Sequence, residues 1–530
     1  MPTRVTTRLY ERTYGLYLND DFKLSRRITL NLGLRWEVEQ PFREEEDRAA
    51  RGVDLTVPIP ELQGANAPQM SAAVKQFYQG SWTFNGAYRW TGADQKGQWK
   101  ATAGTLSPRA GIALRLDAKS SLRAGWGRYY SPWLRSSNLT QGNFYGFALE
   151  TTAPGPLLGI PQMALDNPFP PATFPVQAVT GKTLGDYTGL GSALSWFANE
   201  RPRQHLDRIN VSYQREIFGT VVDATYFLNT ANGPAARNIN MTDPRIGYTN
   251  KAAINQSVPN PFYNILTPAK FPGTLRNQPN VALSSLLVPY PQYGALNVTD
   301  YENNGGLRYH QFSLRVRKGF GAGIAFLGGY SYTYAKNLTY YDDQDQFLQQ
   351  RTWLNDTQAR HRITFGGMWQ FPVGRGRQLL SSAPRALDAI VGGWNFSPVL
   401  TWRSGNFLSF PGLIATGDPR IDNPGPTGWF DTTKFAVLPA FTRRANPWVY
   451  DGVTGPAFFN LDASMVKSVA ITERFSAEIR LDSFNVPNRM TWNDPSTAIS
   501  STFFGKSSGQ FNLNGVGVGR TTQMGLRIRF

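Results

Sequence analysis

Apolar and polar residues alternate along the final ten residues of the chain, TTQMGLRIRF. Successive side chains of a β-strand point to opposite faces, so the alternation predicts one apolar and one polar face. Arg527 and Arg529 fall on the polar face. An arginine facing the middle of a bilayer costs about 2–4 kcal/mol, so in a membrane strand both should face a lumen. The apolar face holds Met524, Leu526, Ile528 and Phe530.

The same alternation recurs in segments of about ten residues, the length of a tilted membrane strand. Aromatic residues such as Trp36, Tyr129, Tyr130 and Trp402 stand near segment ends, as an interfacial girdle requires. The pattern predicts thirteen strands. They lie near 14–24, 27–38, 109–116, 120–130, 203–216, 220–229, 307–318, 323–335, 359–371, 392–403, 458–469, 473–485 and 521–530.

Short and long links alternate between these strands. Short turns are expected at 25–26, 117–119, 218–219, 319–322 and 470–472. Long excursions rich in Pro, Gly and Asn are expected at 39–108, 131–202, 230–306, 336–358, 404–457 and 486–520. Outer-membrane barrels have short periplasmic turns and long extracellular loops, whereas a soluble β-sandwich has no reason to separate them. The segment 372–391 is long for a periplasmic turn.

Composition supports the same fold class. Charged residues make up 17% of the chain, below the roughly 25% of soluble domains, and aromatic residues make up 13%. No apolar run reaches the roughly 18–20 residues of a membrane helix. A soluble β-sandwich array or propeller would share this composition. The sequence therefore predicts an all-β, antiparallel up-and-down transmembrane barrel because of its loop pattern.

The formal net charge of +17 does not indicate a nucleic-acid partner. Arginine and lysine are scattered through the strand segments, often at alternate positions, with no dense basic tract. We interpret them as residues that face the lumen of a barrel. The chain has no cysteine, which excludes disulfides, thiolate metal sites and cysteine nucleophiles.

Candidate chemistry is sparse. His205, His310 and His361 each begin a strand and form no metal or catalytic motif, so no enzyme and no cofactor are predicted. The compact carboxylates of TYYDDQDQF are weak calcium candidates, but the loop lacks the EF-hand glycine and distal glutamate, which favours a solvated acidic loop. These carboxylates are Asp342, Asp343 and Asp345. Loop aromatics could stack on a ligand or pack between loops. They include Trp133, Tyr145, Trp196, Tyr263 and Trp429.

The start of the chain suggests a missing segment. The residues before Tyr14 have no apolar h-region, so no secretory signal is seen. Bacterial single-chain barrels have an even number of strands, whereas thirteen strands would begin on the extracellular side. We therefore expect at least one further strand upstream of Tyr14.

Several segments in order resemble the Oar-like TonB-dependent transporters. They are YGLYLNDDFKLSRRITLNLGLRWE, LSPRAGIALRLDAKSSLRAGWGRYY, LRYHQFSLRVRKGFGAGIAFLGGYSYTYAKN, RHRITFGGMWQFPVGRGR, GGWNFSPVLTWRSGNFL and LDSFNVPNR to RIRF. The resemblance spans essentially the whole chain. It implies a barrel of about twenty-two strands, of which residues 1–530 are the C-terminal part. It also implies a preceding signal peptide, β-sandwich and plug, for which nothing before Tyr14 offers a match.

The resemblance further implies a function and partners. TonB would act through the plug to admit an unidentified ligand bound by the extracellular loops. The terminal strand, with Met524, Leu526, Ile528 and Phe530, resembles the signal read by the barrel-assembly machinery. The expected location is the bacterial outer membrane, in contact with lipid and lipopolysaccharide. The alternatives are a passive porin, a surface adhesin or a secreted soluble carbohydrate-binding protein.

Overall fold

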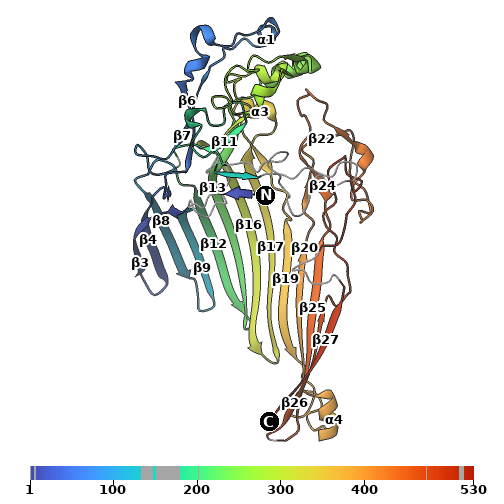
Figure 1. The fold of residues 1–530 in the computed structure, drawn as a ribbon. Helices are drawn as coiled ribbons and strands as arrows, with labels where there is room; N and C mark the ends of the chain where they lie inside the picture. Colours follow the sequence, from blue (N-terminus) through green and yellow to red (C-terminus); the bar gives the residue numbers. More distant parts are fainter. Residues whose placement is uncertain are drawn as a thin grey trace, which may run out of the picture.

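One antiparallel sheet dominates the computed structural model, which describes residues 2–4, 8–132, 147–150, 179–200, 202–472, 474–511 and 519–530 (Figure 1). Strands that follow one another along the chain are neighbours in this sheet. In chain order they are β3 (Thr13–Lys23), β4 (Ile28–Glu39), β8 (Thr105–Arg115), β9 (Ser120–Tyr130), β12 (His205–Ile217), β13 (Thr220–Asn238), β16 (Leu296–Gly321), β17 (Ile324–Thr339), β19 (His361–Gln370), β20 (Trp394–Arg403), β25 (Phe458–Ala470), β26 (Ser476–Phe484) and β27 (Thr521–Arg529). All thirteen predicted strands are confirmed.

The short turns gather at one end of the sheet and the long excursions at the other (Figure 1). Phe218 and Gly219 join β12 to β13 with φ angles of 50° and 71°. Two consecutive positive φ angles are the type I′ geometry, whose twist matches that of the flanking strands. The predicted separation of loop lengths is therefore present in the fold.

The register of the strands gives the sheet two different faces, because directly paired residues project to the same side. One row of paired residues is apolar across five strands, and the adjacent row is polar or small. The apolar row is Leu32, Ala110, Trp126, Ile209 and Leu228. The adjacent row is Gly33, Arg109, Gly127, Arg208 and Asn229. The scattered arginines of the sequence thus include residues gathered on one face.

The apolar face is openly exposed. Leu18 on β3 is 75% exposed and Met524 on β27 is 79% exposed. Apolar patches this extended are rare on soluble monomers and fit contact with lipid.

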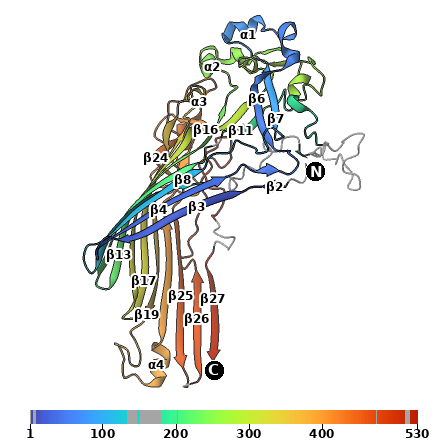
Figure 2. The same ribbon diagram turned by 90° about the vertical axis from the view of Figure 1, so that its left-hand side faces the viewer.

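The sheet is open along two edges (Figures 1 and 2). β3 and β27 are its outermost strands, and every residue of both is exposed. Within the described residues, β3 pairs with β4 and β27 pairs with β26, and neither edge strand pairs with the other.

Two central strands continue well beyond their predicted ends. The sequence predicts strands at 220–229 and 307–318, but β13 has 19 residues and β16 has 26. Glycine, proline and asparagine in these extensions predict loops, yet ladder pairing continues as far as Asn238 opposite Asn297. Two short strands join this sheet: β11 (Leu194–Phe197) runs parallel to β16, and β18 (Thr352–Asn355) pairs with β17.

The long excursions contain short strands and helices of their own. Their strands outside the large sheet are β5 (Arg43–Glu44), β6 (Ala50–Pro58), β7 (Asn85–Trp90), β10 (Ala148–Glu150), β14 (Ser257–Pro259), β15 (Asn280–Ala282), β21 (Phe407–Ser409), β22 (Leu413–Ala415), β23 (Phe435–Val437) and β24 (Val449–Thr454). Two strands that precede β3 pair with them: β1 (Pro2–Arg4) with β10 and β2 (Leu9–Tyr10) with β5. The helices of the excursions are α1 (Ala72–Phe77), α2 (Pro244–Asn250) and α3 (Asp343–Phe347), with short 3-10 helices at 60–62, 64–66, 185–187, 251–255, 274–277, 283–286 and 432–434. The helix α4 (Arg385–Val391) lies at the opposite end of the sheet (Figure 2).

The protein core lies in these excursions and not in the sheet. Segments 50–90, 190–194 and 254–296 contribute to one large buried cluster, in which Phe262, Phe271 and Leu283 are fully buried. A second cluster surrounds Phe410, which stacks on Phe435 with ring centroids 4.3 Å apart. In the described part of the chain, no helix is long and apolar enough to cross a membrane.

Candidate functional site

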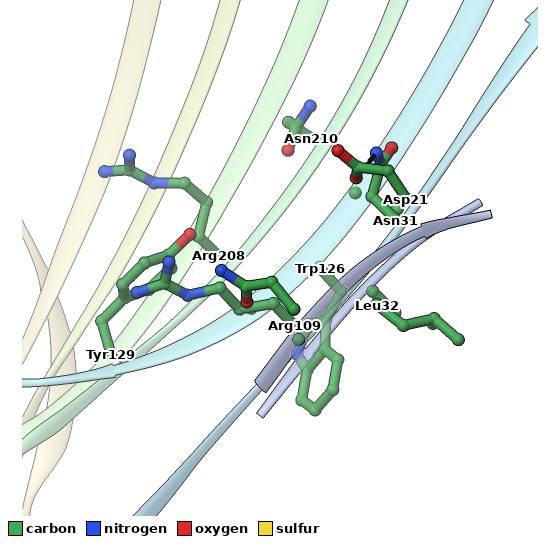
Figure 3. Close-up of a pocket in the computed structure, with 14 residues that line it drawn as sticks. Asp21, Asn31, Leu32, Arg109, Trp126, Tyr129, Arg208 and Asn210 are labelled. Carbon is green, nitrogen blue, oxygen red and sulfur yellow. Dashed lines mark hydrogen bonds between the residues drawn. The ribbon is translucent and has the colours of Figure 1, made fainter. Parts of the chain in front are cut away.

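A hollow of about 300 Å³ lies on the polar face of the sheet, across β3, β4, β8, β9 and β12 (Figure 3). Its rim carries guanidinium, amide and phenol groups. These are provided by Arg109, Arg208, Asn19, Asn31, Asn210 and Tyr129. The residues come from five strands, and strand pairing brings them together.

Two arginines flank a glycine at the centre of this hollow. Gly127 pairs with Arg109 on one side and with Arg208 on the other. The Arg109 guanidinium lies 4.8 Å from the centre of the Tyr129 ring, and Arg208 Nε donates to Asn229 Oδ1 at 3.0 Å. Within the described residues neither guanidinium has a carboxylate partner, so both keep charge available for an anion.

Glycines form the floor because neighbouring side chains lie across them. A Cβ at Gly33 would stand 2.5 Å from Asn19 Oδ1, and a Cβ at Gly125 would stand 3.0 Å from Asn210 Oδ1. The first distance is too short for any side chain without movement of Asn19. Asp21 is the acidic member of the hollow, and it accepts a hydrogen bond from Asn31 Nδ2. The site is therefore rich in donors and suits an anionic, oxygen-rich group.

The sequence pattern alone does not reveal this hollow. The signal was present as Arg109 and Gly111 two residues apart in PRAG and as Gly125 and Gly127 two residues apart in GWGR, but such spacing only fixes a face within one strand. The register between β8, β9 and β12 is needed to place Arg109 and Arg208 on either side of Gly127.

A second cavity, of about 630 Å³, lies among three of the long excursions. Its walls are mostly apolar and aromatic. Tyr341 stacks near Trp448 with ring centroids 6.4 Å apart, and Tyr341 donates a hydrogen bond to the carbonyl of Asn446. Trp448 Nε1 is buried without a hydrogen-bond partner among the described residues, so it offers a donor to a bound molecule.

The three candidate calcium aspartates lie beside this cavity but make protein contacts. Asp342 caps α3 by accepting from the Asp345 amide at 2.9 Å, and Arg443 bonds to Asp342 and Asp345 at 3.2 and 3.1 Å. Asp343 accepts from the Tyr248 hydroxyl at 2.6 Å, and burial followed by this bond raises the pKa of Tyr248. Among the described residues, no group of three or more His, Cys, Asp or Glu side chains is arranged to hold a metal ion.

The three histidines and the loop aromatics singled out in the sequence lie in different parts of the structure. His310 and His361 bond through Nδ1 to Tyr226 and Tyr330, at 2.6 and 2.9 Å, whereas His205 lies 3.8 Å from Asp207. Among the loop aromatics, Trp196 packs against the large cluster, Trp429 packs against the second cluster and Tyr263 is exposed. Trp133 and Tyr145 lie outside the described residues.

The terminal strand presents its apolar side chains together. Met524, Leu526 and Ile528 pair with Leu481, Ile479 and Ala477 of β26, on the apolar face. Phe530 follows the strand and is 95% exposed. This placement leaves the four residues open to recognition, and their role as an assembly signal stays a prediction.

A carboxyl pair lies where β4 meets the excursions. The pKa of Glu11 is raised to about 8, first by burial and then by a hydrogen bond with Glu39 and the charge of Glu39, while the charge of Arg203 opposes the shift. Arg203 also pairs with Glu37 at 2.8 Å and with Glu39 at 3.4 Å. Glu11 should therefore hold a proton at neutral pH.

We expect this pair to make the fold more stable in mild acid. A carboxyl with a raised folded-state pKa gives its full stability below its unfolded value of 4.5 and loses it as pH rises through about 8. The thermal midpoint of the full-length protein that contains this barrel, measured in mild detergent, should decrease as the pH is raised from 5 to 9. Glu11→Gln should flatten this dependence, whereas the control Asp422→Asn at an exposed site should retain it. An unchanged slope in Glu11→Gln would contradict the assignment.

The family model described as "Outer membrane beta barrel domain" matches residues 2–523. No curated protein matches the chain.

Solved structures that match the chain include two bacterial receptors and one bacterial transporter. They are the ferric-catecholate import receptor Fiu from E. coli K12 in its closed form (10% identity, TM-score 0.38, 99% of this chain and 45% of that one), the outer membrane transporter YddB from Escherichia coli (10%, 0.40, 99% and 54%) and the ferric preacinetobactin receptor BauA from Acinetobacter baumannii (10%, 0.40, 98% and 43%). The chain spans about half the length of these proteins.

The family match covers nearly every strand, and it agrees with the exposed apolar face and the alternating loop lengths. The chain therefore belongs to the outer membrane β-barrel domain family and is a protein of the bacterial outer membrane.

Proposed function

We propose that this chain is the barrel part of a TonB-dependent receptor, of the Oar-like kind, that takes up a solute and catalyses no reaction. The observation that carries the proposal is the pair of uncompensated arginines on the polar face, Arg109 and Arg208. In a barrel this face lines the lumen, so the arginines would meet a solute that has passed the long excursions. The loop cavity with its unpartnered Trp448 donor supplies a first place of capture.

TonB would act through the plug that the family resemblance implies. The plug, the β-sandwich, the signal peptide and the upstream strands all stay predictions, as does contact with the barrel-assembly machinery. Placement in the outer membrane argues against the secreted soluble alternative.

Conductance in a planar bilayer separates a gated receptor from a passive porin. We expect the full-length protein containing this barrel to show no steady conductance, because a plug would close the lumen. A steady open channel would overturn the receptor proposal in favour of a porin. Cells that bind a surface but show no TonB-dependent uptake would favour an adhesin.

The arginine pair should determine affinity for anions. Citrate, used as a tricarboxylate probe, should bind the full-length protein that contains this barrel. Arg208→Gln should raise the Kd for citrate about ten- to a hundredfold, which corresponds to the loss of a hydrogen bond to a charged group (about 1.5–3 kcal/mol). Arg109→Lys should retain more affinity than Arg109→Gln, since it keeps the charge but loses the planar fork. Isothermal titration calorimetry measures both effects.

A matched control tests whether charge alone is responsible. Arg385→Gln removes the same charge at the far end of the molecule and should leave citrate binding unchanged. Equal loss of binding in Arg385→Gln and Arg208→Gln would show a diffuse effect of net charge, and the hollow would lose its assigned role.

A further inference from the structure

The link between β19 and β20 differs from the other turns at its end of the sheet. It runs from Phe371 to Gly393 and contains the helix α4 (Figures 1 and 2). The β12–β13 turn, by contrast, needs only Phe218 and Gly219. Two residues are enough to join two adjacent antiparallel strands, so the connection between β19 and β20 does not require the additional residues of this link.

The last turn of α4 covers the apolar face at the strand ends. Lys467 of β25 shares that face with Trp394 and Ile479, its partners on the adjacent strands. Its ammonium donates to the carbonyl of Gly392 and lies 5.4 Å from the centre of the Trp394 ring. Trp394 Nε1 in turn donates to the carbonyl of Ile390 at 3.0 Å. The link is therefore fixed to the outside of the barrel wall, at the level where the apolar face ends.

From this position the link directs large apolar side chains away from the protein. Ile390 is 69% exposed, and three leucines of the same link are at least 40% exposed. The leucines are Leu379, Leu380 and Leu387. In water this would be an unfavourable patch, but it is continuous with the lipid-facing side of the sheet.

Exposed cations accompany these apolar side chains. Arg375, Arg377 and Arg385 are exposed, and none forms an ion pair with a carboxylate in the described part of the chain. Asp388, the nearby acid, instead accepts from the Arg375 backbone amide at 2.6 Å. Arginine beside apolar residues is the composition of segments that lie at a membrane interface, where phosphate groups meet acyl chains.

We propose that residues 374–391 dock onto the phospholipid of the periplasmic leaflet of the outer membrane. Leu387 and Ile390 enter the acyl-chain boundary, and the three arginines contact lipid phosphates. Two observations favour lipid as the partner of this link. Its apolar patch continues the membrane-facing side of the sheet, and its positively charged arginines complement lipid phosphates. The inference depends on the outer-membrane location and not on the transport proposed above.

Single cysteines can test this docking because the chain has none of its own. We would reconstitute the full-length protein that contains this barrel, with any other cysteines replaced, in vesicles of phosphatidylethanolamine and phosphatidylglycerol. Labelling by a membrane-impermeant maleimide is then measured. Leu461→Cys, on the apolar face of β25, first verifies insertion by its protection. Ala118→Cys, in the exposed β8–β9 turn at the same end of the sheet, is the water-exposed reference.

We expect Ile390→Cys to react at least tenfold more slowly than Ala118→Cys. A fluorophore attached at Ile390→Cys in detergent before reconstitution should be quenched by brominated acyl chains, whereas one at Ala118→Cys should not. Since Ile390 is mostly exposed from the protein itself, slow labelling without quenching would indicate cover by protein and would overturn the proposal. Equal labelling rates would overturn it too.

The arginines have their own test. In vesicles of the same lipids, Arg375→Gln combined with Arg385→Gln should raise the labelling rate of Ile390→Cys and leave that of Leu461→Cys unchanged. An unaltered rate at Ile390→Cys would show that phosphate contacts do not hold the link, contrary to the proposal.

Discussion

Leu314→Arg is expected to destabilise the membrane-inserted sheet by about 2–4 kcal/mol, the cost of an arginine at the bilayer midplane. Leu314 lies in the membrane-spanning part of β16 and pairs with Ala224 and Tyr330 on the apolar face. Tryptophan fluorescence during denaturant unfolding in lipid vesicles measures the change. The reason is that Leu314→Arg places a positive charge among lipid chains, which offer the guanidinium no anionic partner.

The adjacent residue provides the control. Ser313 projects from the polar face, where its partners Thr225 and Ser331 are small. Ser313→Arg adds the same charge one residue away and should change the free energy of unfolding by less than about 1 kcal/mol, as expected for a lumen-facing position. Similar losses for the two variants would mean that the faces have been assigned to the wrong environments.

A second large effect concerns the open edges of the sheet. The residues 1–530, produced alone, are expected to migrate as unfolded protein in SDS without heating. Among the residues that the structure describes, no strand pairs with the outward N–H and C=O groups of β3 and β27, and in lipid each such unpaired group costs several kcal/mol. Closed barrels resist SDS because every backbone group is paired. Gel mobility of heated and unheated samples, with limited proteolysis, gives the result.

Two other results on the SDS gel would lead to different conclusions about the edge strands. A heat-modifiable, protease-resistant monomer would show that β3 and β27 pair after all, and would contradict the prediction. An SDS-resistant dimer would show the edges satisfied by strands of a second copy, which is the known hazard of exposed edge strands.

Much of the sheet could be predicted from sequence because two constraints coincide there. Lipid on one face and water on the other force an alternation with a period of two, as in the last strand around Leu526 and Arg527. Short turns then fix the order of the strands, since neighbours along the chain become neighbours in space. The lengths of β13 and β16 were the furthest from prediction, because ladder hydrogen bonds extend through residues whose propensities favour loops.

The sites could not be predicted in the same way. Arg109, Gly127 and Arg208 become neighbours only through the register of three strands, and register depends on turn lengths and on bulges that no local pattern reveals. The aspartates near Asp342 were visible as an acidic cluster, but their partner Arg443 lies about a hundred residues away in another excursion. The large buried cluster could not be predicted, because the segments around Leu62, Phe262 and Leu283 that form it share no periodic pattern of apolar residues.

The extended strands determine which part of the molecule the outside world encounters first. At roughly 3.3 Å per residue the 26 residues of β16 span about 85 Å, more than twice the thickness of a bilayer core. They raise the cluster around Phe262 well above the lipid. A phage or an antibody approaching the cell would therefore touch this cluster before the membrane-embedded wall. Because separate stretches of chain assemble it, such a binder would recognise a folded shape, and short peptides copied from the sequence should fail to compete for it.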